Sequence, residues 1–198
     1  KKESLNFLRW SDISVIEKDE SIFISLLQGK LSKLQLLTPD IELTLYYNVT
    51  ISRDHSDVDS LYSLTEEQRP DILLKIKRQS KEVYIVFDAK YRYNIKNEFE
   101  FYPVPDGINQ IHRYRDSIMR RNAEKSYSQA IWGGFVLFPG YNTIDEIRAC
   151  YYYSSIKYTQ IGALQICPNN EDGISLLKQI LYSLCFDYYA WESSTQSH

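Results

Sequence analysis

Polar and apolar residues alternate along much of the chain, which is the pattern of β-strands whose two faces differ in burial. Residues 41–51 (IELTLYYNVTI) alternate almost strictly. Apolar-rich runs that fit strands occur at 21–27, 34–37, 41–51, 72–77, 83–90, 130–138, 147–153 and 161–166. The polar or mixed segments 52–69 and 93–105 are expected to be loops. A short polar segment, 78–82, joins two of the runs and predicts a β-hairpin.

Two other segments repeat apolar residues at the period of an α-helix. One runs from about 107 to 121 and the other from about 174 to 191. The apolar face of the first helix carries Ile108, Ile111, Ile118 and Met119. The opposite, polar face carries Asp106, Gln110, Arg113 and Ser117, with Tyr114 at the border. This order of elements predicts an α/β fold in which helices flank a mixed β-sheet core.

The composition is that of a globular protein, since the 198 residues are 43% hydrophobic and 25% charged. A net charge of −3 does not favour a surface that attracts nucleic acid everywhere, although local patches can be basic. No apolar run approaches the roughly 18 residues of a membrane span, so we expect no membrane partner. The chain has no glycine-rich phosphate loop, which argues against nucleotide binding.

Cysteine usage favours a cytoplasmic location. Cys150, Cys167 and Cys185 lack a CxxC spacing and lie in apolar surroundings, so we expect buried free thiols in a reducing compartment. The chain opens in the middle of an amphipathic pattern without an initiator Met. We therefore expect residues 1–40 to continue from an upstream domain and residues 41–198 to form the functional core.

The predicted hairpin carries the chemistry. Asp71 begins its first strand, and Asp88 and Lys90 close its second, so both carboxylates fall at one end. Two carboxylates and the carbonyl of Ala89 are suitable ligands for Mg²⁺ or Mn²⁺. Lys90 shares a strand face with Asp88, and its ammonium can orient the attacking water or stabilise a phosphoryl transition state. The alternation turns Phe87 and Ala89 the other way, into the core. The alternative is a surface ion pair between Asp88 and Lys90.

The predicted helix adds a polar stripe. Gln110 and Tyr114 are four residues apart, close to Asp106 and Arg113, and amide, phenol and guanidinium groups suit a phosphate backbone. A solvated face is the alternative interpretation. Arg113, Arg120 and Arg121 are candidate contacts to the DNA backbone.

Together these motifs resemble the PD-(D/E)XK nuclease superfamily: Pro70-Asp71, then Asp88-Ala89-Lys90, then a helix with Gln110-x-x-x-Tyr114. Within it, the chain resembles the nuclease domains of McrC-like restriction proteins. The resemblance spans roughly residues 41–185, with further similar segments at 45–48, 69–72, 87–92, 106–116, 136–140 and 161–168. It implies a restriction-endonuclease-like fold.

The resemblance also implies roles for the site residues. Asp71 and Asp88 become metal ligands, Lys90 the catalytic lysine, and Gln110 and Tyr114 the helix residues beside the substrate phosphate. An acid on a first helix often completes such sites, and Glu3 is the one candidate in the opening segment.

The function expected from this resemblance is a Mg²⁺-dependent (or Mn²⁺-dependent) DNA endonuclease domain of a restriction or phage-defence system. Its expected partners are DNA and a McrB-like AAA+ NTPase subunit. Two alternatives stay open: a domain with an incomplete site that only binds DNA, and an assembly domain that docks an NTPase ring. The sequence does not indicate an oligomeric state.

Overall fold

The computed structural model describes residues 8–11, 14–18, 21–25, 32–79, 81–97, 100–122 and 126–186. The chain forms two compact units that alternate along the sequence. The first comprises Lys1–Tyr84 and Ser117–Ala130, and the second comprises Ile85–Asp116 and Ile131–His198. Strand β8 (Lys81–Ala89) begins in the first unit and ends in the second.

The first unit is built of strands. Its main sheet has the order β1-β4-β5-β7-β8, and the smaller sheets are β2-β3 and β12-β11-β6. The strands are β1 (Leu8–Ser11), β2 (Ser14–Lys18), β3 (Ser21–Ser25), β4 (Ser32–Leu37), β5 (Glu42–Tyr47), β6 (Leu61–Ser63), β7 (Ile72–Arg78), β11 (Ile118–Arg121) and β12 (Tyr127–Gln129). Antiparallel register places Leu45 of β5 between Leu34 of β4 and Leu74 of β7. Alternation along the strands therefore gathers leucines on one face of this sheet.

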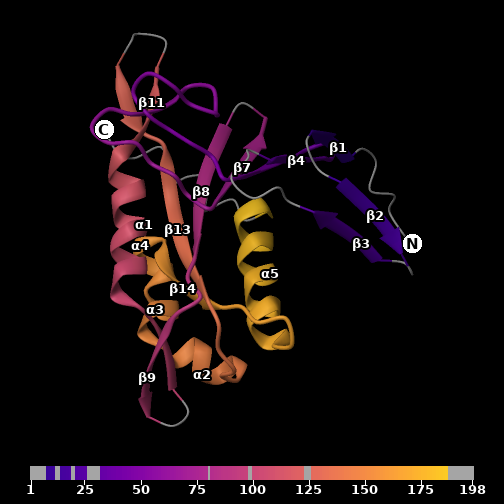
Figure 1. Cartoon of the computed structure of the whole chain (residues 1–198), viewed down its shortest axis with the longest axis vertical. Helices are drawn as coiled ribbons and strands as arrows, with labels where there is room; N and C mark the ends of the chain where they lie inside the picture. The colour runs from indigo at the N-terminus through magenta and orange to yellow at the C-terminus, as the bar shows by residue number, and fades with distance from the viewer. Residues whose placement is uncertain are drawn as a thin grey trace. The chain divides into compact units, whose positions relative to one another are not determined.

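The second unit combines strands and helices. Its main strands have the order β8-β13-β14, and β9 pairs with β10 in a separate hairpin. The elements are β9 (Tyr93–Asn97), β10 (Glu100–Pro103), α1 (Pro105–Ser117), β13 (Ile131–Phe138), α2 (Ile144–Ala149), α3 (Tyr151–Ser154), α4 (Ile156–Thr159), β14 (Ile161–Gln165) and α5 (Glu171–Phe186). Strands β13 and β14 are parallel, and the helices α2 to α4 supply the crossover that such a pair needs. Figure 1 shows α1 and α5 flanking these strands.

Helix α1 packs very closely on the strands beneath it. Its buried residues are Gly107, Ile111 and Tyr114, spaced by one helical turn each. A Cβ atom added to Gly134 of β13 would lie 2.8 Å from Cγ2 of Ile111 and 2.4 Å from Cγ2 of Val86. Such distances are too short for any side chain, so glycine at 134 is what lets α1 approach the sheet.

Most of the expected strands are confirmed, including the hairpin strands β7 and β8, and so is the α/β class of the fold. The expected strand at 147–153 is wrong, because this segment forms the helices α2 and α3. Thr143 and Glu146 form a capping box that starts α2.

Two other expectations need correction. The first helix ends at Ser117 rather than near Arg121, since residues Ile118–Arg121 form β11 and pair with both β6 and β12. The expected loop 93–105 contains the β9–β10 hairpin, and the expected loop 52–69 contains β6. The last helix begins earlier than expected, at Glu171, and residues 187–191 lie outside the described part of the chain.

Two sequence predictions concern burial and membranes. All three cysteines are free thiols, but only Cys185 is buried, whereas Cys150 and Cys167 are partly exposed. None of the helices in the described residues has the length and hydrophobicity that a bilayer span requires.

Candidate functional site

Strand β8 carries Asp88 into the interior. Residues from Val83 to Asp88 are all buried, and Asp88 itself is only 3% exposed. Pairing continues past the end of the strand, since the backbone N–H of Lys90 donates to the carbonyl of Leu137 at 2.8 Å. Backbone pairing therefore fixes the direction in which both side chains leave the strand.

The side chains of Asp88 and Lys90 form an ion pair. Nζ of Lys90 lies 2.5 Å from Oδ2 of Asp88, and the Lys90 side chain is 27% exposed. Burying a carboxylate is costly unless a cation compensates it, and Lys90 supplies that cation. The alternative interpretation of the sequence was a surface ion pair between Asp88 and Lys90. The ion pair is present, but the Asp88 carboxylate is buried rather than on the surface. Phe87, as expected, lies in the core, where the centres of its ring and the Phe135 ring are 5.5 Å apart. Ala89, which was expected in the core as well, is only partly buried.

The first turn of α1 lies directly against the stem of Lys90. A Cβ atom added to Gly107 would lie 3.4 Å from Cγ of Lys90 and 3.1 Å from both methyl groups of Val136. The sequence interpretation did not assign Gly107 a role. The sequence did contain one indication of this role. Gly107 precedes Ile111 by four residues, about one helical turn, and so lies on the same face of the helix, which is buried.

Gln110 and Tyr114 differ in their exposure to solvent. Gln110 is partly exposed, and its side-chain oxygen accepts a hydrogen bond from the Arg113 guanidinium. Tyr114 is 3% exposed, so its expected position at the border of the polar face is wrong. The packed face runs through Gly107, Ile111 and Tyr114, while Ile108 is only partly buried.

The arginines are divided between the two units. Arg113 is exposed on α1 in the second unit. Arg120 and Arg121 belong to β11 in the first unit, where the Arg120 guanidinium lies 5.3 Å from the centre of the Tyr84 ring. Arg121 is exposed. That all three contact DNA stays a prediction.

Asp71 belongs to the first unit. It precedes β7, is partly exposed, and its backbone carbonyl accepts a hydrogen bond from the N–H of Asn48 at 3.0 Å. Asp88, Lys90 and Gln110 belong to the second unit, so the approach of Asp71 to Asp88 stays a prediction. Glu3 lies outside the described residues.

The donor chemistry at the end of β8 fits a hard divalent cation. Asp88 offers a carboxylate and Ala89 a backbone carbonyl, which are the oxygen ligands that Mg²⁺ and Mn²⁺ prefer. The described residues contain no group of three or more His, Cys, Asp and Glu side chains placed to hold a metal. The suitability of this site for Mg²⁺ or Mn²⁺ therefore rests on the oxygen donors of Asp88 and Ala89 and not on a cluster of acidic side chains.

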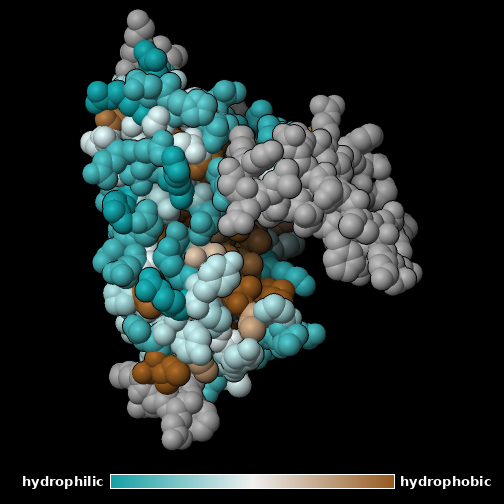
Figure 2. Space-filling model, in the orientation of Figure 1, coloured by the Kyte–Doolittle hydropathy of each residue, from teal (hydrophilic) through white to brown (hydrophobic). Residues whose placement is uncertain are grey.

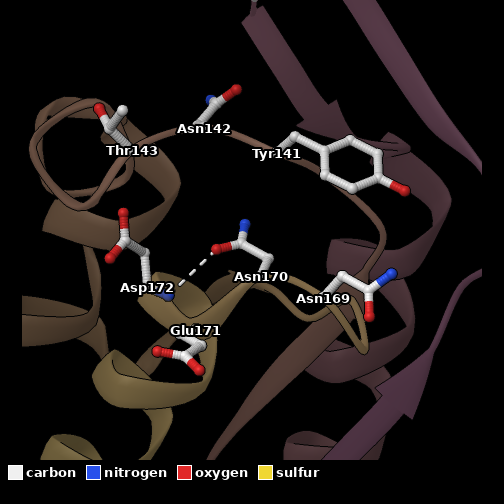
Figure 3. A pocket seen from close by; sticks show the side chains of 7 residues that line it. All are labelled: Tyr141, Asn142, Thr143, Asn169, Asn170, Glu171 and Asp172. Carbon is white, nitrogen blue, oxygen red and sulfur yellow. Dashed lines mark hydrogen bonds between the residues drawn. The ribbon is translucent and has the colours of Figure 1, made fainter.

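A separate polar pocket of about 330 Å³ lies between the starts of α2 and α5 (Figure 3). Its lining residues are Tyr141, Asn142, Thr143, Asn169, Asn170, Glu171 and Asp172, none of which was a predicted site residue. Asn170 accepts hydrogen bonds from the N–H groups of Asp172 and Gly173, and Asp172 accepts one from Ile144. These side chains are engaged in capping helices, which accounts for their polarity without a ligand.

The fold and the site define a class of protein. A mixed sheet flanked by helices, with a buried aspartate and a lysine two residues later at a strand end, is a restriction-endonuclease-like arrangement. Residues 6–143 match the family model of the PD-(D/E)XK nuclease superfamily. The match covers more than half of the 198 residues, and the chain belongs to this superfamily. No curated protein and no solved structure matches it.

Proposed function

We propose that this chain is the Mg²⁺-dependent (or Mn²⁺-dependent) DNA endonuclease domain of a restriction or phage-defence system. The observation that carries the proposal is the buried Asp88 paired with a partly exposed Lys90 beneath the first turn of α1, in a member of a nuclease superfamily. Asp71, Asp88 and the carbonyl of Ala89 would hold the cation. When bound, such a cation stabilises charge on the phosphate and acidifies a coordinated water.

Lys90 has a second task in this proposal. Its ammonium has three N–H donors, and the contact with Asp88 uses one side of it. Because the side chain is 27% exposed, the remaining donors can reach a phosphate oxygen or the attacking water. A lysine held beside a buried carboxylate keeps its position without reorganisation, which is the condition for electrostatic stabilisation of a transition state.

Helix α1 would position the substrate backbone. Gln110 and Arg113 are joined by a hydrogen bond and present an amide and a guanidinium together, a pair suited to phosphate oxygens. Tyr114 contributes by holding the helix against the sheet, since it is buried. We infer further DNA contacts for Arg120 and Arg121.

The finer assignment comes from the resemblance to McrC-like nuclease domains. It supports a cytoplasmic restriction protein that works with a McrB-like AAA+ NTPase. A catalytically incomplete domain that binds DNA or docks the NTPase is the second candidate. It is favoured by one observation: no group of three metal-ligating side chains occurs in the part of the chain that the structure describes.

Plasmid nicking tests the proposal. The wild-type chain should nick plasmid with Mg²⁺ or Mn²⁺ and not with EDTA, and Asp88→Asn and Lys90→Ala should each reduce the rate about a hundredfold or more. Asp54→Asn and Lys157→Ala, which change an exposed acid and an exposed lysine, should leave it unchanged. Metal-dependent nicking that survives both site substitutions would remove the assigned site. No nicking by the wild type, with DNA binding intact, would favour the second candidate.

A further inference from the structure

The β9–β10 hairpin occupies a particular place in the chain. Strand β9 begins at Tyr93, three residues after Lys90, and α1 begins at Pro105, two residues after β10 ends at Pro103. The hairpin is therefore inserted between the motif lysine and the motif helix. Its position relative to the proposed catalytic site is constrained by these short connections.

The base of the hairpin is held on both faces by aromatic rings. On one face, Phe101 packs edge-on against Tyr141, with ring centres 6.2 Å apart. On the other face, Tyr102 stacks on Tyr151 of α3, also at 6.2 Å. The buried Gln165 of β14 also donates from its side-chain nitrogen to the carbonyl of Phe101 at 3.3 Å. The base of the hairpin is thus anchored to the unit that carries Lys90.

The segment from Tyr91 to Ile95 exposes large apolar side chains, although the ring of Tyr93 also packs edge-on against Phe101, with ring centres 5.0 Å apart. Tyr91 is 91% exposed, Ile95 58% and Tyr93 40%. Figure 2 shows one small hydrophobic area at the place where Figure 1 locates β9; tyrosines do not stand out as hydrophobic on its colour scale. Exposed apolar side chains that gather at one place indicate a binding surface.

The charge of this segment favours nucleic acid over an apolar partner. Residues 91–97 read YRYNIKN, with two cations and no acid, and Arg92 is exposed. The two acidic residues of this segment, Glu98 and Glu100, come later in the sequence, and Glu100 pairs with Asn97 at the end of the hairpin away from Lys90. Aromatic side chains interleaved with cations are the combination that binds single-stranded nucleic acid, by stacking on bases and attracting phosphates.

The reach of the chain limits which bases can be contacted. An extended chain spans about 3.5 Å per residue, so Tyr93 lies within roughly 10 Å of Lys90. Along one strand of a duplex, at about 3.4 Å per nucleotide, that distance corresponds to about three nucleotides, and in an extended single strand to fewer. A phosphate at Lys90 would therefore have its neighbouring bases near Tyr91 and Tyr93.

We propose that Tyr91, Tyr93 and Ile95 bind the bases of the substrate strand beside the phosphate that is cut, with the two tyrosines within about three nucleotides of it. The two tyrosines stack on bases that are unpaired or unstacked, and Arg92 pairs with the adjoining phosphate. This inference rests on the proposed nuclease function for its substrate. It predicts a preference for single-stranded or locally opened DNA over intact duplex.

Binding of a single-stranded oligonucleotide that contains 2-aminopurine tests this inference, with Ca²⁺ in place of Mg²⁺ to limit cleavage. The wild type should quench the probe by stacking, and Tyr91→Ala/Tyr93→Ala should abolish quenching and weaken binding roughly ten- to a hundredfold. Tyr91→Phe/Tyr93→Phe keeps both rings and should bind like the wild type. Tyr158→Ala, which removes a tyrosine that is 75% exposed elsewhere in the same unit, is the matched control.

The outcomes separate this inference from the proposed function. Quenching and affinity that are unchanged in the double alanine variant would overturn the inference, even if the wild type cuts DNA. Loss of binding to a protein partner alone, with DNA binding intact, would also overturn it and assign the surface to that partner. Quenching that depends on the hairpin, in a wild type that never cleaves with metal, would support the inference and contradict the nuclease proposal. Equal melting temperatures of the variants exclude misfolding, since all the substituted side chains are exposed.

Discussion

Tyr84, near the start of β8, is a buried residue whose ring and hydroxyl both contact charged side chains. Its ring lies 5.6 Å from Nζ of Lys75 and 5.3 Å from the Arg120 guanidinium, and its hydroxyl donates to Glu82 at 3.1 Å. Burial is the main reason that the pKa of Tyr84 is raised, so the phenol stays a neutral donor at all ordinary pH values. Cation–π contacts and hydrogen bonding, including the bond to Glu82, thus satisfy a tyrosine that is only 1% exposed.

The pH dependence of stability can be predicted from Glu82. Burial tends to raise the pKa of its carboxyl, but the hydrogen bond and charge of Lys75, 2.6 Å away, outweigh burial and hold the pKa below its ordinary value of 4.5. Glu82 therefore stabilises the fold above pH 4.5, and this contribution is lost as the pH falls through the depressed pKa.

Thermal unfolding of Glu82→Gln checks this. The variant should be about 1 kcal/mol less stable than the wild type at pH 7, and the difference should shrink as the pH is lowered below 4.5. Glu66→Gln, in an exposed loop, serves as the control and should follow the wild type. A difference that stays constant down to strongly acidic pH would show that charge is not the cause.

At the scale of elements, the docking of α1 couples helix packing to the position of Lys90. Gly107→Ala would place a methyl group 3.1 Å from Val136 and 3.4 Å from Lys90, so these side chains must shift by a few tenths of an ångström. Alanine also favours a helix by about 1 kcal/mol over glycine, so we expect little change in stability. The expected loss is in cleavage, by about tenfold, because a small misplacement of the proposed catalytic lysine, Lys90, is costly.

A second substitution distinguishes positioning from general damage. Gly107→Ala/Val136→Ala removes the crowded methyl groups and should regain cleavage, although the added cavity lowers stability. Asn109→Ala, on the exposed face of α1, is the control for helix propensity. If the double variant cuts no better than Gly107→Ala, Gly107 does not position Lys90.

The elements differ in how well the sequence predicts them. Strands such as β5 and β13 are evident because local alternation or an apolar run specifies them. The sequence predicts a strand at 147–153, whose tyrosines favour strands, yet the capping box of Thr143 and Glu146 upstream is a helix signal. The sequence does not predict where α1 ends, because the helix stops where Ile118 pairs with Ser63 of β6, a residue distant in the sequence.

In the candidate site, too, local patterns predict some placements, and tertiary contacts decide others. Lys90 was placed beside Asp88 by strand alternation, a local rule, and their ion pair confirms that placement. The burial of Tyr114 depends on which helix face meets the sheet, and Gly134 of a later strand makes room for that face at Ile111. Tertiary contacts of this kind are absent from the local pattern.

For the whole molecule, the net charge bears on the proposed binding of DNA. A chain with a net charge of −3 gains little from general attraction to phosphates, so a divalent cation should contribute much of the affinity. We expect millimolar Ca²⁺ to tighten DNA binding about tenfold relative to EDTA, measured by fluorescence anisotropy.

Asp88→Asn tests whether that cation binds at the proposed place. The substitution removes a negative charge, so simple electrostatics predicts tighter DNA binding in EDTA. Loss of a metal ligand predicts that the effect of Ca²⁺ disappears. Asp54→Asn removes the same charge from an exposed loop and should keep the Ca²⁺ effect. A Ca²⁺ effect of wild-type size in Asp88→Asn would place the cation elsewhere.

The pairing of Tyr93 with Pro103 brings the two ends of the β9–β10 hairpin next to each other. A segment whose ends meet can be lengthened, shortened or exchanged without moving the chain on either side of it. Related nucleases can therefore diversify this hairpin while Lys90 and α1 keep their places. It is also the natural site at which to graft a new recognition loop onto this scaffold and so redirect the enzyme to other substrates.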